Sequence, residues 1–166
     1  MDYVQDIHNL PGLERAFREA PGIVADELVA AAWESELLLE RETKELTPVG
    51  VGGTLRSSVA AREPKVLADN VIGEVGTPLK YAIPVELGTK PHFPPIAPLV
   101  EWAERKLGLS PNEAHHVGFL IQRKIGRKGT EGAFMFKRAF EAGRGQVERF
   151  FENAAARIVE RMGRMA

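Results

Sequence analysis

The chain has 166 residues, 44% hydrophobic and 27% charged, which is enough apolar sequence for one hydrophobic core. It has no cysteine, so disulfides, thiolate zinc sites, iron–sulfur clusters and thiol catalysis are excluded. Its 22 basic and 23 acidic residues give a net charge of −1, so the chain as a whole is not drawn to nucleic acid or to anionic membranes. We expect one domain over residues 1–166, with an N-terminal arm at 1–22, a proline-rich connection at 91–98 and a C-terminal helical extension at 143–166.

The charges are distributed unevenly along the chain. Residues 1–48 contain 11 acidic and 4 basic residues, a net charge of −7, whereas residues 123–144 contain 7 basic and 2 acidic residues, a net charge of +5. A contact with a polyanion would come from the second region, although solvated helix surfaces give the same pattern. The N-terminal residues show no basic segment followed by an apolar one, and no run of about 18 apolar residues occurs, so we expect synthesis in a cytoplasm and no membrane partner.

A long amphipathic helix is predicted from Ile23 to about Glu45, since good helix formers fill this stretch and neither glycine nor proline interrupts it. The helix must end near Thr47-Pro48, because proline cannot continue the hydrogen-bond ladder. Glycines make residues 49–53 a loop.

A small antiparallel sheet is predicted next. Apolar and polar residues alternate from Leu55 to about Arg62, which indicates a half-buried strand, and a second short strand covers about 71–75. The alternation that begins at Leu79 predicts a third strand that ends near Tyr81, because Pro84 cannot donate a ladder hydrogen bond.

Helices are predicted for the rest of the chain. After the extended prolines of 91–98, a helix covers about 97–107 with Pro98 in its first turn and Gly108 at its C-cap. Ser110-Pro111-Asn112-Glu113 has the form of a capping box and opens a helix that Gly126 closes, so 127–132 is a loop. A last helix runs from about Phe136 to the end of the chain, weakened or bent at Gly143 and Gly145. The order of helix, small sheet and helices predicts an α+β fold.

Candidate chemical sites are few. His115-His116, with Glu113 and His92, are the candidates for a transition-metal site, but adjacent helical residues point about 100° apart, so we expect no metal and no cofactor. Ser57 and Ser58 lack the turn that exposes a catalytic serine, and the glycines at 50, 52 and 53 lack the lysine of a phosphate-binding loop. Glu86 could act as a general acid or base if buried, yet a structural carboxylate that caps a turn or pairs with a base is favoured.

One basic cluster stands out. Arg123, Lys124, Arg127 and Lys128 lie at the end of a predicted helix, where they would contact DNA phosphates without reading sequence, because no aromatic side chains are interleaved. The same residues would also complement the helix dipole.

Several segments occur in an order that resembles a known family. Thr47-Pro48-Val49 and Gly53-Thr54-Leu55-Arg56-Ser57-Ser58 resemble the T-P-V…G-x-L-R-x-S opening of small neck and tail-completion proteins (minor tail protein Z-like) of long-tailed bacteriophages and prophages. Residues 75–77, 81–82 and 85–89 resemble the V-G-T…Y-A-x-x-V-E-x-G-T core of that family, and 128–130 with 134–140 resemble its closing stretch. Gly50 departs from the acidic residue that the family often has there. The positions that carry the resemblance most directly are Thr47, Pro48, Gly53, Leu55, Arg56, Ser58, Tyr81, Ala82, Val85, Glu86, Gly88 and Thr89.

The resemblance implies a non-enzymatic virion protein that forms a ring, with a hexamer favoured, and that completes the tail and joins it to the DNA-filled head. Its expected partners are copies of itself and the neighbouring neck, tail-terminator and tail-tube proteins, with non-specific contact to genomic DNA. An edge strand extended by a neighbour's strand would close such a ring. We expect Pro91, Phe93 and Ile96, after Gly88-Thr89, to lie near a subunit or partner contact.

Other functions remain open from the sequence. A tail terminator or a head–tail connector ring would share the same small fold. From other classes, a small enzyme using Glu86 and a histidine, or a DNA-binding regulator built on the basic helix, is the alternative.

Overall fold

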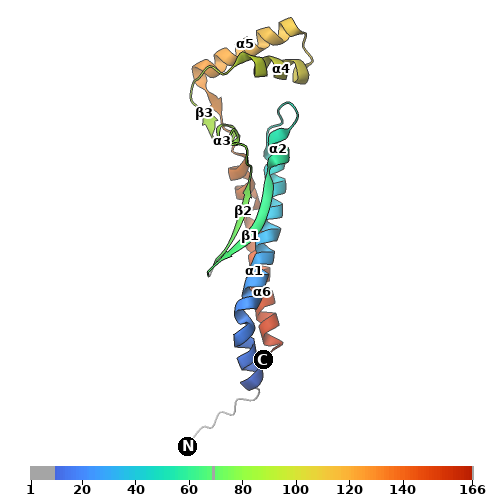
Figure 1. The fold of residues 1–166 in the computed structure, drawn as a ribbon, viewed down its shortest axis with the longest axis vertical. Helices are drawn as coiled ribbons and strands as arrows, with labels where there is room; N and C mark the ends of the chain where they lie inside the picture. Colours follow the sequence, from blue (N-terminus) through green and yellow to red (C-terminus); the bar gives the residue numbers. More distant parts are fainter. Residues whose placement is uncertain (1–9, 69, 166) are drawn as a thin grey trace, which may run out of the picture. The chain divides into compact units, whose positions relative to one another are not determined.

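The computed structural model describes residues 10–68 and 70–165. In chain order the elements are α1 (Leu10–Leu46), α2 (Thr54–Ser58), β1 (Ala60–Leu67), β2 (Asn70–Gly76), α3 (Ala82–Leu87), β3 (Gly88–Thr89), α4 (Ile96–Leu107), α5 (Pro111–Lys128), β4 (Thr130–Glu131) and α6 (Met135–Gly163) (Figure 1). β1 pairs with β2, and β3 pairs antiparallel with β4. The predicted α+β fold, with its long N-terminal helix, small sheet and C-terminal helix, is confirmed.

The described residues form two compact units. Unit 1 contains 10–38, 61–68, 70–74 and 143–165, and unit 2 contains 39–60 and 75–142. Both α1 and α6 pass from one unit into the other.

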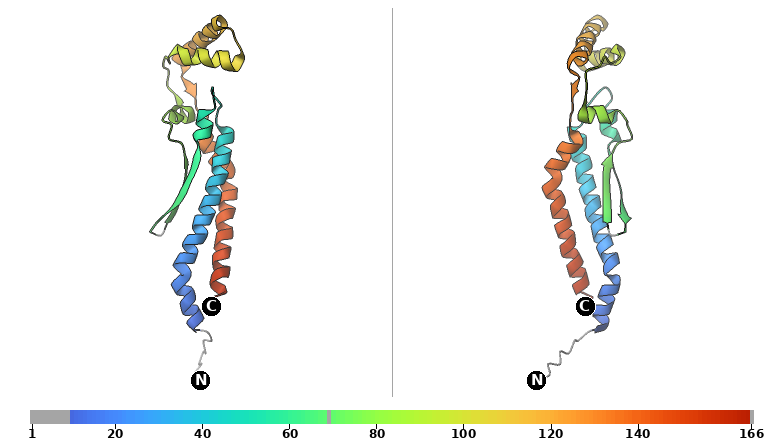
Figure 2. Two further views of the ribbon diagram at one scale, coloured as in Figure 1. Left: turned by 45° about the vertical axis from the view of Figure 1, so that its right-hand side comes forward. Right: turned by 90° about the vertical axis from the view of Figure 1, so that its left-hand side faces the viewer.

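Unit 1 consists of the first part of α1, the second part of α6 and most of the β1–β2 hairpin, with α1 lying between α6 and the hairpin (Figure 2). Arg157 on α6 donates to the Glu27 carboxylate on α1 at 2.6 Å, and Arg161 donates to the same carboxylate at 3.0 Å. A two-stranded hairpin is marginally stable by itself and needs a helix to pack against. Here the Glu36 carboxylate of α1 accepts a hydrogen bond from the Glu74 N–H of β2 at 2.6 Å.

Helix α1 begins at Leu10, so it starts earlier than the predicted Ile23 and passes through Pro21. Proline removes one hydrogen bond of the helix ladder. Ala16 and Ile23, on either side of it, are both buried, and this packing offsets the missing bond. Helix α1 ends at Leu46, as the Thr47-Pro48 sequence predicts.

The predicted strand over 55–62 is wrong in its first half, because Thr54–Ser58 is helix α2 and the strand begins at Ala60. Leu55 and Val59 are both buried, and a spacing of four residues fits a helical turn as well as it fits alternation. The side chains of Ser57 and Ser58 donate to the carbonyls of Thr54 and Leu55, which stabilises the turn. The second predicted strand is confirmed as β2.

The predicted third strand is also wrong, because residues 79–81 form a turn and Ala82–Leu87 form helix α3. Leu79, Ala82 and Val85 are three residues apart and pack on one core, which a helical turn achieves and a strand does not. Pro84 lies in the first turn of α3, where its missing N–H has no helical acceptor.

Helices α4 and α5 pack against each other, with buried Ala103 and Ala114 in their interior. The predicted caps are present: Gly108 ends α4 with φ 66°, and the Glu113 carboxylate accepts from the N–H of Ser110 at 3.0 Å and from its hydroxyl at 2.6 Å. The predicted end at Gly126 is wrong, because α5 continues to Lys128 and ends at Gly129, whose φ is 71°. Part of the predicted 127–132 loop is strand β4, and α6 is one helix through Gly143 and Gly145.

Candidate functional site

The core of unit 2 brings together segments that are far apart in the sequence. The side chain of Met135, at the start of α6, has no exposed surface, and Leu55 of α2 and Ala82 of α3 are buried against it. Leu46, Leu79, Val85 and Phe136 pack around these three. Three of the positions that carry the family resemblance, Leu55, Ala82 and Val85, therefore contribute to one hydrophobic cluster.

Thr47 and Arg56 fix the end of α1 next to this core. The Thr47 hydroxyl is buried, 2.6 Å from the carbonyl oxygen of Thr43 and 3.3 Å from the sulfur of Met135. The Arg56 guanidinium donates to the carbonyls of Glu45 and Thr47 at 3.5 and 3.4 Å. A cation at the carbonyl end of a helix satisfies unpaired acceptors and complements the helix dipole.

Gly53 and Ser58 shape the segment around α2. Gly53 precedes α2 with φ 65°, a left-handed conformation that costs glycine little. The Ser58 hydroxyl lies 2.7 Å from the Thr77 hydroxyl, and the Thr77 oxygen also accepts from the Leu79 N–H at 3.2 Å. These bonds connect the end of α2 to the turn before α3.

Glu86 caps the N-terminus of α6. Its carboxylate accepts hydrogen bonds from the backbone N–H of Phe136 at 3.1 Å and of Lys137 at 3.2 Å. The carbonyls of Val85 and Glu86 accept from the N–H groups of Ala133 and Phe134 at 2.8 and 3.1 Å. The favoured interpretation of Glu86 as a structural, capping carboxylate is confirmed, because both oxygens are used at the positive end of a helix.

Gly88 and Thr89 form β3, which pairs with Glu131 and Thr130 of β4. The hydroxyls of Thr89 and Thr130 lie 2.9 Å apart, and the Thr130 N–H donates to the Thr89 hydroxyl at 3.2 Å. Gly88 has φ 78°, and a side chain there would overlap the Thr130 carbonyl oxygen. Glycine is therefore required for β3 to approach β4.

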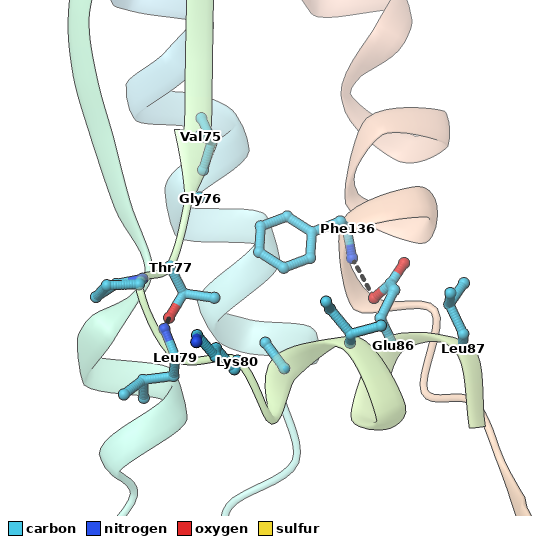
Figure 3. Close-up of a pocket in the computed structure, with 11 residues that line it drawn as sticks. Val75, Gly76, Thr77, Leu79, Lys80, Glu86, Leu87 and Phe136 are labelled. Carbon is cyan, nitrogen blue, oxygen red and sulfur yellow. Dashed lines mark hydrogen bonds between the residues drawn. The ribbon is translucent and has the colours of Figure 1, made fainter. Parts of the chain in front are cut away.

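An open depression with a volume of about 480 Å³ lies beside this network (Figure 3). Its walls come from the end of β2, the turn at 77–80, helix α3 and Phe136. Figure 3 shows the Phe136 ring beside the end of β2 and the Glu86 carboxylate turned toward the start of α6. Ile83 and Leu87 on this wall are 64% and 65% exposed, so α3 presents apolar side chains to solvent. Near Pro48, a smaller hollow of about 230 Å³ is lined in part by Tyr81 and Val85.

The proline-rich segment packs on α5. The His92 N–H donates to the Ile125 carbonyl at 3.4 Å, and the Gln122 side chain donates to the Pro94 carbonyl at 2.7 Å. The Phe93 ring lies against Gly126, in the space that a side chain there would need, yet 73% of Phe93 is exposed. Pro91 is exposed, and Ile96 is the first residue of α4 rather than part of the extended connection.

The four predicted DNA-contacting residues are brought together. Arg123, Lys124, Arg127 and Lys128 are exposed and, with Leu120, line a hollow of about 300 Å³ on α5. The candidate metal ligands are not brought together: within 10–68 and 70–165, no group of three or more His, Asp or Glu residues could hold a metal ion. Among those same residues, no helix is long and apolar enough to cross a membrane.

The structure also shows interactions to which sequence reasoning assigned no role. Thr77 contacts Ser58, and Met135 contacts Thr47. The sequence pointed to Thr77 and Met135 only through the segments that resemble the family. The pairing of Glu27 with Arg157 has no local signal, because 130 positions separate the two residues. These hydrogen bonds lower the pKa of the Glu27 carboxyl below its ordinary value, the bond from Arg157 contributing most.

Residues 13–88 match the family model described as "Bacteriophage HK97-gp10, putative tail-component". The match covers most of α1, all of α2, the β1–β2 hairpin and α3, and it ends at Gly88, so it includes Thr47, Arg56 and Glu86. The predicted resemblance to bacteriophage tail proteins is therefore confirmed. Comparisons with curated proteins and with solved structures gave no significant match.

Proposed function

Because residues 13–88 match a family of bacteriophage tail components, we propose that this chain is a structural protein of the phage neck or tail that assembles as a ring, completes the tail and joins it to the DNA-filled head. The family indicates the role of tail component. The exposed apolar side chains of unit 2 and the hairpin of unit 1 support the ring. The protein would be made in the host cytoplasm and would end in the virion.

The exposed apolar side chains of unit 2 are the observation that carries the ring proposal. Ile83, Leu87 and Phe93 are each more than three-fifths exposed. Ile83 and Leu87 border the depression of about 480 Å³. Exposed apolar surface favours association, because burial removes it from water. We place a subunit or partner contact on this surface and on the neighbouring segment from Pro91 to Ile96.

The hairpin of unit 1 supports the same proposal. Among the described residues β1 pairs with β2 alone, and Val66, Leu67 and Ile72 on the hairpin are about half exposed. A strand edge of this kind can accept the strand of a neighbouring subunit. Contacts between two different surfaces of identical subunits form a ring when their rotation closes, and a hexamer is the stoichiometry we favour.

A non-enzymatic role is proposed together with the ring. The family is one of structural tail components. Glu86, the carboxylate considered for acid–base chemistry, is engaged by the N–H groups of Phe136 and Lys137. A group held by two backbone donors at a helix terminus stabilises the fold and is poorly placed to exchange protons with a substrate.

Electron microscopy of a lysate from a phage or prophage that lacks this gene tests the proposal. Full heads beside separate, normal-length tails are expected if the protein joins the two. Tails of abnormal length would assign it to tail termination, and empty or leaking heads would assign it to a connector on the head. Normal infectious particles would overturn a role in the neck or tail. A small enzyme or a DNA-binding regulator would then be the function to test.

A further inference from the structure

Helix α5 ends in an exposed basic surface, which we define as Arg123, Lys124, Arg127 and Lys128. The spacing i, i+1, i+4, i+5 places the four residues on one side of the helix, in two pairs separated by a rise of about 6 Å. All four are exposed, and together with Leu120 they line the hollow of about 300 Å³. Four cations therefore line one open hollow.

These cations lack the acidic partners that five other helical cations have. Lys44, Arg105, Lys137, Arg144 and Arg164 each pair with a glutamate one turn away. In the basic surface, Arg123 has Arg127 one turn away and Lys124 has Lys128, and within the described part of the chain none of the four forms an ion pair. Like charges at this spacing destabilise a helix, so the arrangement favours an external anion.

The four basic side chains are not engaged by the carbonyl groups at the end of α5. Cations near a helix C-terminus can serve the last carbonyls, but within the described residues none of these four side chains donates a hydrogen bond to a carbonyl, and the Ile125 carbonyl accepts from the N–H groups of Gly129 and His92 instead, at 2.8 and 3.4 Å. The acidic residue of α5, Glu113, is in its first turn and is engaged by Ser110. The charge of the basic surface is thus available to a ligand.

We propose that the basic surface binds the phosphate backbone of double-stranded DNA without sequence preference. A double helix presents a dense row of phosphates, which Arg and Lys at two points along a helix can contact together. A lipid surface fits less well, because the other side of α5 packs on α4, with Gly118 against Val100, and is not available to enter a membrane. The acidic surface of a second copy is the competing ligand, and the oligomeric state of the variants distinguishes it. In the neck or tail role proposed above, the DNA would be the genome in its channel, and this identification of the DNA rests on the proposed function.

The test is the affinity of the purified full chain for a fluorescent DNA duplex of about 30 base pairs and arbitrary sequence, measured by anisotropy at several salt concentrations. The quadruple variant Arg123→Gln, Lys124→Gln, Arg127→Gln and Lys128→Gln is compared with a control of equal charge change, Arg105→Gln, Lys106→Gln, Lys137→Gln and Arg138→Gln. The expected slope of log affinity against log salt is roughly −3 to −4 for four neutralised phosphates. In the quadruple variant the slope should approach zero, and the affinity at low salt should drop at least about tenfold. In the control the slope should stay within about one unit of the value for the unmodified protein.

Three results would overturn the inference. Equal losses in both variants would show that net charge, and not this surface, governs binding. Binding to phosphatidylglycerol vesicles without binding to DNA would assign the surface to a membrane. A change of oligomeric state in the first variant, with DNA affinity unchanged, would assign it to a protein contact. DNA affinity is measured without ring assembly, so the two proposals are tested separately. The protein can fail to bind DNA and still be a tail component, and it can bind DNA without being one.

Discussion

The carboxylate of Glu86 accepts a hydrogen bond from the backbone N–H of Phe136 at 3.1 Å, although 50 positions separate the two residues. Glu86 lies near the end of α3, and Phe136 is the second residue of α6. A helix N-terminus normally obtains its acceptor from the residue just before it, whereas here the acceptor comes from another helix. The capping bond is therefore also a tertiary contact inside unit 2.

Replacing Glu86 with alanine should destabilise unit 2 by about 1–2 kcal/mol, because two N–H groups of α6 lose their acceptor and the helix dipole loses an anion. Urea denaturation followed by circular dichroism measures the change. Glu141→Ala, on the exposed surface of α6, is the control and should stay within about 0.5 kcal/mol of the unmodified protein. Equal stability of the Glu86 variant and the control would show that the cap contributes nothing.

Replacing Gly88 with alanine should cost roughly 1–3 kcal/mol or prevent folding of unit 2, because φ is 78° and the added carbon would overlap the Thr130 carbonyl. Gly76→Ala is the matched control, since no atom lies within 4 Å of the added carbon there. Thermal unfolding of the two variants gives the comparison. A melting temperature for Gly88→Ala as high as that of Gly76→Ala would contradict the close approach of β3 and β4.

The pH dependence of stability should include a loss at low pH that comes from Glu27. Its pKa is lowered by hydrogen bonds from Arg157 and then Arg161, so its contribution is present above the ordinary value of 4.5 and is lost as pH falls through the lower, folded value. Glu27→Gln should therefore reduce the difference in melting temperature between pH 7 and pH 3. Glu19→Gln, at an exposed position of α1, should leave that difference unchanged. Parallel pH profiles for the protein and for Glu27→Gln would refute the pairing in solution.

Glu36 should show the opposite pH dependence. Burial raises the pKa of its carboxyl; the Glu74 N–H bond opposes that shift, and one of its oxygens has no hydrogen-bond partner among the described residues. A raised folded pKa means that the contribution of Glu36 becomes less favourable as pH rises from 4.5 through the folded value. The stability of Glu36→Gln relative to the unmodified protein should therefore increase between pH 4 and pH 8. Denaturant midpoints at the two pH values measure this, and a constant difference would contradict the burial of a titrating carboxyl.

The placement of a contact on the proline-rich segment predicts that Phe93→Ser with Ile96→Ser impairs assembly. Because 73% of Phe93 is exposed, most of its surface is available to a partner, although its ring also lies against Gly126. The oligomeric state from light scattering and the yield of joined particles are the readouts, with circular dichroism to confirm folding. Val159→Ser, on the exposed surface of α6, controls for the general loss of apolar surface. Unimpaired assembly of the folded double variant would remove this segment from the contact.

The sequence by itself determined those features that depend on neighbours within a few residues. The capping box at Ser110 and Glu113, the C-cap at Gly108 and the end of α1 before Pro48 are each decided by local backbone geometry and hydrogen bonding. The order of motifs also predicted the tail family that residues 13–88 match. The predicted grouping of Arg123 with Lys128 holds because helical spacing alone places them on one side of α5.

Only the tertiary structure decided the rest. Leu55 and Val59 fit a strand and a helical turn equally well, and Leu55 is in a helix because its side chain packs against Ala82 and Met135, which the local pattern does not contain. Packing on the same core also explains why Ala82–Leu87 form helix α3 and not the expected third strand. Glu86 could be a catalyst or a cap until the start of α6 was placed beside it. Hydrophobic periodicity reports which residues are buried, but the free energy that selects a conformation comes from partners far along the chain, and those partners are fixed only when the chain folds.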